Sequence, residues 1–219
     1  MTNVYLIPGL GGDKRMYAGQ LSHFPLAKVL EFIRPVENES ISSYAKRLAE
    51  GIDTTQPFIL VGVSLGGMLA QEIANIYSPV KTIIISSVKS RSELPLWIRF
   101  FKFLPVQKII PGKFYLWAFM LLVGLKTLFS KSNNVIGNLK NMARDADPVF
   151  VYWAVNQVIN WKNPIKQFEA YHIHGNNDFL FPIRRLANVS TVVDHGTHAM
   201  ILTHVKEINV ALKQELEPA

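Results

Sequence analysis

Short apolar runs alternate along this chain with segments whose apolar residues recur at helical spacing. The apolar runs predict buried strands at Val4–Ile7, Lys28–Ile33, Phe58–Val63, Val80–Ile85, Ala170–His174 and Thr191–Asp194. Helical spacing covers Ser40–Ile52, Leu65–Tyr77 and Ala199–Glu215. Such alternation is typical of a parallel sheet covered on both faces. We therefore predict an α/β fold with a mostly parallel sheet of about six strands and helices on both faces.

Residues 89–166 interrupt this alternation. The segment is rich in aromatic residues, carries several prolines and has the pattern of several helices. An apolar helical insertion between two strands predicts a cap laid over the carboxyl edge of the sheet, where ligands bind in open α/β folds. We predict that residues 1–88 and 167–219 form the core and that residues 89–166 form a helical cap, or lid.

The composition is that of a globular chain, with 49% hydrophobic and 18% charged residues in a total of 219. Its formal net charge is +7, and residues 89–166 alone hold 12 Lys or Arg against 3 Asp or Glu. These basic residues are interleaved with apolar ones and match no groove-reading motif, so we do not expect nucleic acid as a partner. Such a charge usually belongs to a solvated face. The alternatives are that it attracts an anionic substrate, such as a coenzyme A thioester, or makes a weak contact with an anionic membrane surface.

Three further features limit the function classes. The chain has no cysteine, which excludes thiolate catalysis, disulfides and cysteine-ligated zinc. The N-terminal residues lack the basic region of a secretory signal, so we expect a cytoplasmic protein. The most apolar stretch, Phe114–Phe129, is shorter than a membrane span and contains Lys126.

A catalytic motif lies between the third predicted strand and its helix. Gly62-Val63-Ser64-Leu65-Gly66 has the G-x-S-x-G pattern of a nucleophile elbow, a strained turn that lifts the serine hydroxyl above the sheet. Small residues flank the serine because strand and helix pack closely there. The pattern predicts Ser64 as a nucleophile. The structural alternative is a helix N-cap serine beside packing glycines.

A serine nucleophile needs a base oriented by a carboxylate, and in this type of site both follow later in the chain. Asp178 follows the fifth predicted strand, and His198 follows the sixth. Asp194 and His195 are the rivals on the latter loop. Asp145 and Asp147, in the predicted cap, are weaker candidates for the acid.

The remaining histidines have a structural interpretation. His23, His172 and His174 are expected to be hydrogen-bonded within the fold. The spacings His172-x-His174 and His195-x-x-His198 also occur in zinc sites, but no carboxylate-rich second shell accompanies them. We expect no metal.

The elbow, a G-x-x-D loop at 175–178 and a G-x-H segment at 196–198 together resemble the α/β-hydrolase fold superfamily. The resemblance covers nearly the whole chain outside the cap. It implies that Ser64 is the nucleophile, Asp178 the orienting acid and His198 the general base. The chain departs from the superfamily in lacking the usual pair of antiparallel N-terminal strands.

The resemblance also implies an oxyanion loop after the first strand, at Pro8-Gly9-Leu10-Gly11-Gly12. Its donors would be the backbone N–H groups of Leu10 and Leu65. Many members of the superfamily have histidine before the first glycine, where this chain has Pro8. The donors are backbone groups, so this departure leaves them in place.

The aromatic and apolar residues of the cap suggest an apolar pocket between cap and sheet. The candidate walls are Trp97, Phe101, Phe119, Trp153 and Met200. The structural alternative is that the cap helices simply pack onto the sheet as core.

The combined prediction is a serine hydrolase that cleaves a carboxylic ester or thioester of a small-molecule acyl substrate through a covalent acyl-enzyme, without a cofactor. The same triad can serve C–C hydrolysis, lyase chemistry or acyl transfer. A non-catalytic small-molecule binding module is the alternative from a different class. The sequence leaves the oligomeric state undetermined.

Overall fold

A computed structural model describes residues 2–100, 133–162 and 169–216. Six strands form one sheet in the order β2-β1-β3-β4-β5-β6, and every neighbouring pair is parallel. The strands are β1 (Asn3–Ile7), β2 (Lys28–Val29), β3 (Phe58–Val63), β4 (Lys81–Ile85), β5 (Tyr171–Gly175) and β6 (Thr191–Val193). The predicted α/β fold is confirmed.

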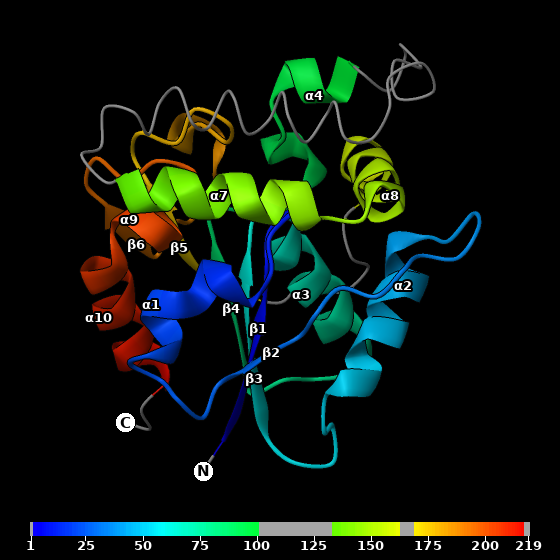
Figure 1. Cartoon of the computed structure of the whole chain (residues 1–219), viewed down its shortest axis with the longest axis horizontal. Helices are drawn as coiled ribbons and strands as arrows, with labels where there is room; N and C mark the ends of the chain where they lie inside the picture. Colours follow the sequence, from blue (N-terminus) through cyan, green and yellow to red (C-terminus); the bar gives the residue numbers. More distant parts are fainter. Residues whose placement is uncertain (1, 101–132, 163–168, 217–219) are drawn as a thin grey trace.

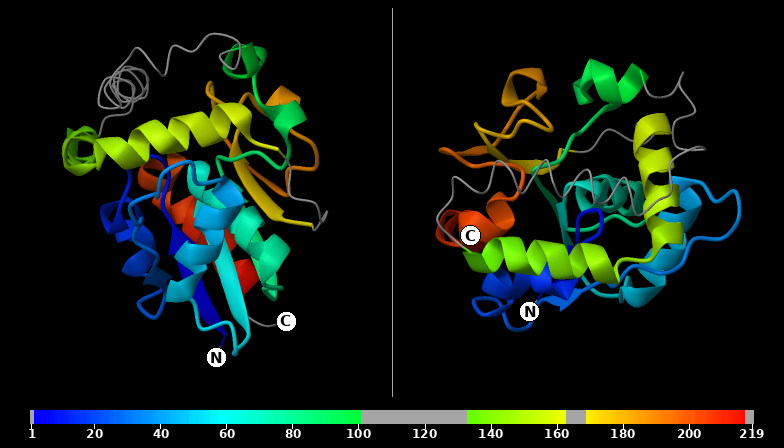
Figure 2. Two further views of the ribbon diagram at one scale, coloured as in Figure 1. Left: turned by 90° about the vertical axis from the view of Figure 1, so that its right-hand side faces the viewer. Right: turned by 45° about the horizontal axis from the view of Figure 1, so that its top comes forward.

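Helices cover both faces of the sheet and its upper edge (Figures 1 and 2). The described α-helices are α1 (Ala18–Leu21), α2 (Ile41–Leu48), α3 (Leu65–Ile76), α4 (Leu96–Phe100), α7 (Asn133–Asp145), α8 (Pro148–Asn160), α9 (Met200–Thr203) and α10 (Val205–Leu216). Short 3₁₀ turns occur at Lys14–Tyr17, Ala49–Gly51, Arg91–Glu93 and Ile183–Arg185. Helices α4, α7 and α8 lie at the carboxyl ends of the strands, the position predicted for the cap.

The sheet separates two hydrophobic cores because alternate strand residues face opposite sides. In β1, Tyr5 and Ile7 pack into one core with α2 and α3, whereas Leu6 packs into the other with α10. All six residues of β3 are buried, as expected for a central strand covered on both faces. These two cores hold β3 and β4 rigidly beneath the turn that follows β3.

Two predicted elements are shorter than expected. The strand predicted at Lys28–Ile33 pairs with β1 only over Lys28–Val29. The Leu30 N–H makes one more bond to β1, to the Leu6 carbonyl at 2.9 Å. Farther along, the Tyr44 hydroxyl accepts from the N–H of Ile33 at 3.1 Å and donates to the Ile33 carbonyl at 2.9 Å, so the main chain of Ile33 bonds to a side chain and not to a strand. The helix predicted at Ala199–Glu215 is broken at His204 into α9 and α10.

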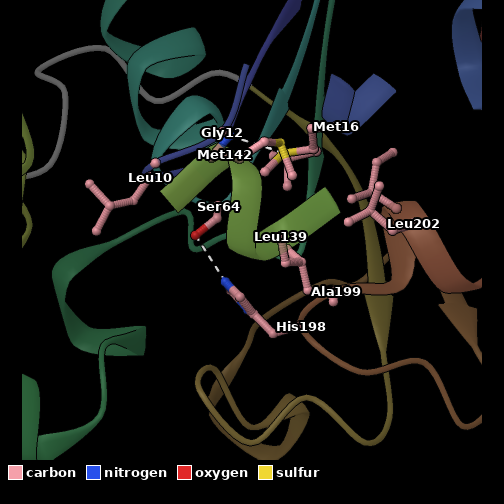
Figure 3. Close-up of a pocket in the computed structure, with 13 residues that line it drawn as sticks. Leu10, Gly12, Met16, Ser64, Leu139, Met142, His198, Ala199 and Leu202 are labelled. Atoms are coloured by element: carbon pink, nitrogen blue, oxygen red, sulfur yellow. Dashed lines mark hydrogen bonds between the residues drawn. The ribbon is translucent and has the colours of Figure 1, made fainter. Parts of the chain in front are cut away.

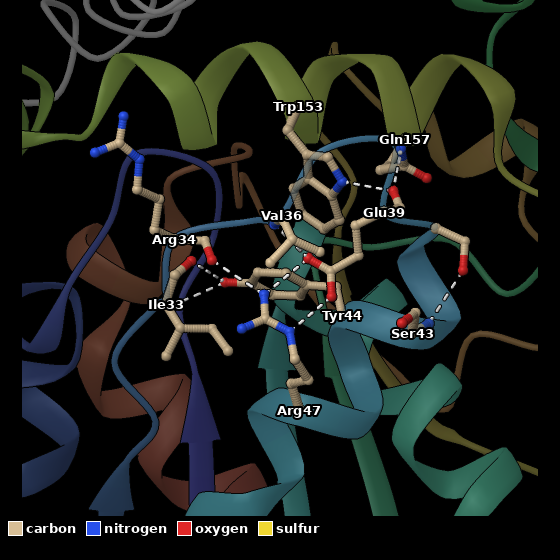
Figure 4. A network of polar contacts seen from close by, with 10 residues as sticks. Ile33, Arg34, Val36, Glu39, Ser43, Tyr44, Arg47, Trp153 and Gln157 are labelled. Carbon is tan, nitrogen blue, oxygen red and sulfur yellow. Dashed lines mark hydrogen bonds and ion pairs between the residues drawn. The ribbon is translucent and has the colours of Figure 1, made fainter.

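Helix α8 is anchored to the core by a polar network around Glu39 (Figure 4). The indole N–H of Trp153 donates to the Glu39 carbonyl at 2.8 Å, and its ring lies 4.2 Å from that of Tyr44. Gln157 donates to the same carbonyl at 3.2 Å and accepts from the N–H of Ile41 at 3.1 Å. The carboxylate of Glu39 is paired with Arg47. These bonds fix α8 against α2.

The described helices include none that is both long and apolar enough to cross a membrane.

Candidate active site

Ser64 occupies a strained turn at the end of β3. Its backbone angles are φ 53° and ψ −116°, in a region that residues with side chains rarely adopt. Backbone contacts hold this conformation, since the Ser64 N–H donates to the Ile85 carbonyl at 2.9 Å and the Ser64 carbonyl accepts from the Ser87 hydroxyl at 2.7 Å. The Ser64 side chain makes no helix-capping hydrogen bond. Ser64 thus stands at the N-cap position of α3 without capping the helix through its side chain.

The flanking glycines are required by close backbone contact. A Cβ atom on Gly62 would lie 2.2 Å from the Gly66 carbonyl oxygen, and one on Gly66 would lie 2.1 Å from the Ile7 carbonyl oxygen. Both distances are far below van der Waals contact. Glycine at 62 therefore allows β3 to approach the start of α3, and glycine at 66 allows α3 to approach the end of β1.

Ser64, His198 and Asp178 form a continuous hydrogen-bonded chain. His198 Nε2 lies 2.9 Å from Ser64 Oγ (Figure 3), and His198 Nδ1 lies 2.8 Å from Asp178 Oδ2. A carboxylate can only accept, so Nδ1 carries the hydrogen and Nε2 is left to accept from the serine hydroxyl. All three residues are buried, with 8%, 5% and 3% of their surface exposed.

Asp178 is held as an anion by the groups around it. Its Oδ1 accepts from the N–H groups of Leu180 and Phe181, each at 2.9 Å. Burial raises the pKa of this carboxyl, but the facing His198, with its hydrogen bond, the nearby His174 and the Phe181 N–H together bring the pKa below its ordinary value. A buried carboxylate in this state can orient an imidazole and stabilise its protonated form.

The loops that carry the acid and the base are joined through their backbones. The N–H of Asn176 donates to the Val193 carbonyl at 3.2 Å, and that of Asn177 donates to the Gly196 carbonyl at 2.9 Å. A Cβ on Gly175 would lie 2.1 Å from the Gly196 carbonyl oxygen, so only glycine permits this approach. The separation of Asp178 from His198 is thereby set by main-chain contacts.

The rival residues from the sequence lie elsewhere. Asp194 and His195 face solvent, with their side chains 77% and 81% exposed. Asp145 forms ion pairs with Arg15 and Arg144, and Asp147 caps helix α8. In the described part of the chain, no group of three or more His, Asp or Glu side chains is arranged so that it could hold a metal ion.

The glycine-rich loop after β1 lies against Ser64. A Cβ on Gly9 would be 3.4 Å from the Ser64 Cβ. The loop is closed by a bond from the Gly12 N–H to the Gly9 carbonyl at 2.9 Å, and the Gly9 N–H points at the sulfur of Met16 at 3.3 Å. Within the described residues the N–H of Leu10 donates to no protein atom. Leu65 is the first residue of α3, so its N–H has no acceptor within the helix.

A small apolar cavity adjoins the serine hydroxyl (Figure 3). It has a volume of about 40 Å³ and is lined beside Ser64 and His198 by the glycine loop and by Met16, Leu139, Met142, Ala199 and Leu202. Leu139 and Met142 come from α7, at a spacing of three residues that places them on one face of the helix. That periodicity in the sequence indicates a buried face on α7, but it does not show that this face covers the cavity.

The predicted pocket walls do not line this cavity where the structure describes them. Trp153 is bonded to Glu39 and packed on Tyr44, because its indole N–H needs an acceptor once buried. Trp97 is 49% exposed on α4, and Met200 is fully buried in the core. Phe101 and Phe119 lie outside the described residues.

Comparison with known proteins places this fold in a family. The model of the alpha/beta hydrolase family matches residues 4–211. The chain belongs to the alpha/beta hydrolase family. No curated protein matches its sequence closely enough to count as a relative.

Solved alpha/beta hydrolase structures resemble the chain over its full length. A thermophilic esterase from Thermogutta terrifontis superposes with a TM-score of 0.74 at 18% identity, covering 99% of this chain and 89% of that one. MenH from S. aureus gives a TM-score of 0.75 at 14% identity, with 99% and 96% covered. A Bacillus megaterium epoxide hydrolase gives 0.66 at 14% identity, with 99% and 93% covered. At these identities the likeness establishes the fold.

Proposed function

We propose that this protein is a serine hydrolase of carboxylic esters or thioesters. The observation that carries the proposal is the chain of hydrogen bonds from Ser64 through His198 to Asp178, at 2.9 and 2.8 Å. Membership of the alpha/beta hydrolase family supports hydrolytic chemistry in general. The named roles rest on the geometry of these three side chains.

The reaction follows from where the hydrogens lie. Ser64 Oγ attacks the acyl carbon while His198 Nε2 takes its proton, and the Asp178 carboxylate stabilises the imidazolium that forms. His198 then protonates the leaving alcohol or thiol, which leaves an acyl group on Ser64. A water molecule that transfers its proton to His198 hydrolyses this acyl-enzyme and restores the serine. No cofactor enters any step.

The oxyanion of each tetrahedral intermediate needs donors that are already in place. The N–H groups of Leu10 and Leu65 are the proposed pair, since they belong to the two segments that flank the Ser64 hydroxyl. Removing one such donor in a related type of site costs about 10²–10³ in kcat. The glycines beside Leu10 allow the substrate to approach the backbone closely.

The cavity beside Ser64 favours a small or medium apolar acyl group. Its described walls are mainly apolar side chains, two of them the flexible methionines Met16 and Met142. Apolar walls stabilise a hydrocarbon chain by removing it from water, and methionine adapts to its shape. We therefore expect p-nitrophenyl esters of apolar acids to be better substrates than esters of charged acids.

The test combines active-site labelling with turnover. A fluorophosphonate probe should label the wild type and leave Ser64→Ala unlabelled, while release of nitrophenol from a series of acyl esters should fall by about 10⁴-fold or more in the variant. Folded wild type that neither reacts nor hydrolyses any ester would refute the proposal and favour a binding module. Labelling without hydrolysis would favour C–C, lyase or acyl-transfer chemistry.

We also propose a weak contact of the cap with anionic membrane surfaces. Leu96, Trp97 and Phe100 are 65%, 49% and 60% exposed on the short helix α4. The sequence from residue 94 to 144 holds eight Lys or Arg and no Asp or Glu. Exposed apolar side chains beside excess positive charge suit a lipid surface that carries negative charge.

Vesicle co-sedimentation tests this contact. The wild type should sediment with phosphatidylserine-containing vesicles more than with pure phosphatidylcholine, and added salt should weaken the effect. The double variant Trp97→Ser, Phe100→Ser should lose it, whereas Val210→Ser, which changes a residue 60% exposed on α10, should retain it. Equal sedimentation of all three proteins would contradict the proposal.

A further inference from the structure

Two histidines of β5 take no part in the proposed reaction: His174, which lies next to the Asp178 carboxylate, and His172, which contacts His174. His172 and His174 are two residues apart on one strand, so their side chains leave the same face of the sheet. Both are fully buried. Their rings meet edge to face, with centroids 5.0 Å apart. Three of the four ring nitrogens have hydrogen-bond partners, which determine where the hydrogens lie, whereas His172 Nδ1 has none in the described part of the chain.

The hydrogen-bond partners define one arrangement. His174 Nε2 is 2.8 Å from the Phe181 carbonyl oxygen, which can only accept, so Nε2 carries a hydrogen. Burial lowers the pKa of both histidines, that of His172 to about 3, so both are neutral near pH 7. A neutral His174 has a bare Nδ1, and His172 Nε2, 3.2 Å away, donates to it. His172 therefore donates to His174, and His174 in turn donates to the Phe181 carbonyl in the loop that carries Asp178.

His174 contacts this loop at two points. The peptide carbonyl of Phe181 accepts from His174, while the N–H of the same residue donates to Asp178 Oδ1 at 2.9 Å. His174 Nε2 also lies 3.4 Å from Asp178 Oδ2, the oxygen that accepts from His198. At that length the contact is electrostatic rather than a full hydrogen bond, and it favours the carboxylate anion.

Phe181 connects the same contact to the base. Its ring lies edge-on to the His198 imidazole, with centroids 5.2 Å apart. A displacement of the Phe181 segment would therefore disturb both the acid and the base. The side chain of His174 bonds this segment to strand β5, in addition to the burial of Leu180 and Phe181 in the core.

We propose that His174 is a positioning residue whose Nε2–H fixes the Phe181 segment and so sets the orientation of Asp178 toward His198, and that His172 supports this tautomer of His174 by donating to its Nδ1. This inference rests on the proposed function of Ser64, His198 and Asp178. Position 174 is not among the described walls of the substrate cavity, so the role predicts an effect on kcat and none on binding.

Two amide substitutions separate this role from a merely structural one. The amide nitrogen of glutamine reaches the place of Nε2, whereas that of asparagine reaches only the place of Nδ1. His174→Gln should keep kcat within about threefold of wild type. His174→Asn should lower kcat by about tenfold or more, with KM within about twofold, because a small misplacement of catalytic groups is costly.

A spectroscopic measurement complements the kinetics. The low-field proton NMR resonance of His198 Nδ1–H, assigned by its loss in His198→Gln, reports the bond to Asp178 directly. It should be unchanged in His174→Gln and shifted or broadened in His174→Asn. Folded His174→Asn protein with unchanged kcat and an unchanged resonance would overturn the proposal.

A second pair of variants covers the case in which His174→Asn does not fold. His172→Asn removes the donor to His174, and His172→Gln retains it. The Asn variant should shift the His198 resonance and the Gln variant should not; identical spectra would overturn the proposal. If the wild type neither hydrolyses esters nor reacts with the fluorophosphonate, the proposed function fails, but the NMR comparison still tests the positioning role.

Discussion

At the scale of single residues, the environment of each carboxylate separates Asp178 from the other candidate acids. Asp178 is buried, accepts two backbone N–H groups on one oxygen and faces an imidazole with the other. Asp194 also lies beside a histidine, but both side chains are exposed to solvent. Water screens that exposed pair, whereas the buried pair interacts at full strength.

Asp178→Asn should therefore lower kcat by about 10⁴-fold, because an amide in this place no longer selects the imidazole tautomer that accepts from Ser64. Asp194→Asn is the matched control and should stay within about twofold of wild type. Steady-state hydrolysis of a p-nitrophenyl ester by both folded variants checks this. Comparable losses in the two variants would show that Asp178 has no special role.

At the scale of secondary-structure elements, the junction of β3 with α3 determines where the serine lies. Gly66 lies at the start of α3 directly against the end of β1. The helix cannot move away without releasing Met68, Leu69 and Ile73 from the core, where all three are fully buried. Packing of α3 therefore supports the strained backbone of Ser64.

Gly66→Ala should destabilise the protein by about 3 kcal/mol or more, since the new Cβ would lie 2.1 Å from a main-chain oxygen that cannot move aside. Gly137→Ala, on helix α7, should instead raise the free energy of unfolding. A Cβ there meets no atom within 4 Å, and alanine favours a helix over glycine by about 0.5–1 kcal/mol. Urea unfolding of both variants measures the difference, and equal midpoints would contradict this view of the junction.

The sequence predicted well those elements whose residue pattern fits only one kind of structure. The apolar runs identified the central strands, and the glycine spacing identified the turn at Ser64, because only a close strand–helix contact needs that pattern. The structure brings Ser64, Asp178 and His198 into hydrogen-bond contact, as the chain order predicted, while their catalytic roles remain our proposal.

The sequence was a poor guide to the substrate cavity. Apolar periodicity shows that a helix has a buried face but not which neighbour it covers, so Leu139 and Met142 could not be assigned to the cavity. Trp153 was misplaced for a different reason. Its indole N–H binds a backbone carbonyl of the loop before α2, 114 residues away in sequence, and no local pattern encodes that contact.

At the scale of the whole molecule, buried histidines make stability depend on pH. The pKa of His172 is about 3 in the native state because burial disfavours its charged form. In the unfolded chain it binds a proton near its ordinary pKa of about 6.5. The stabilisation is therefore complete above that pH and is lost as the pH falls toward 3. Burial lowers the pKa of His174 in the same sense.

The free energy of unfolding should accordingly fall by about 2 kcal/mol between pH 7 and pH 5 from His172 alone. Urea unfolding at both pH values measures the decrease. His172→Gln, which cannot titrate, should show a smaller decrease than wild type. A wild-type unfolding free energy that is constant over this range would contradict a neutral, buried His172.

The pairing of the two loops after β5 and β6 has a consequence for how this architecture can change. Asp178 and His198 belong to one continuous stretch of chain and are aligned by its own main-chain bonds. Ser64 comes from a different part of the chain, the turn between β3 and α3. The chain between the start of helix α4 and the start of β5 can then be lengthened, shortened or replaced without altering the spacing of Asp178 and His198, whereas Ser87, just after β4, has to stay because its hydroxyl binds the Ser64 carbonyl. If the proposed roles of Ser64, His198 and Asp178 hold, a lineage with this layout is free to exchange the segment that covers them, and with it the molecules admitted, while the three side chains keep their alignment.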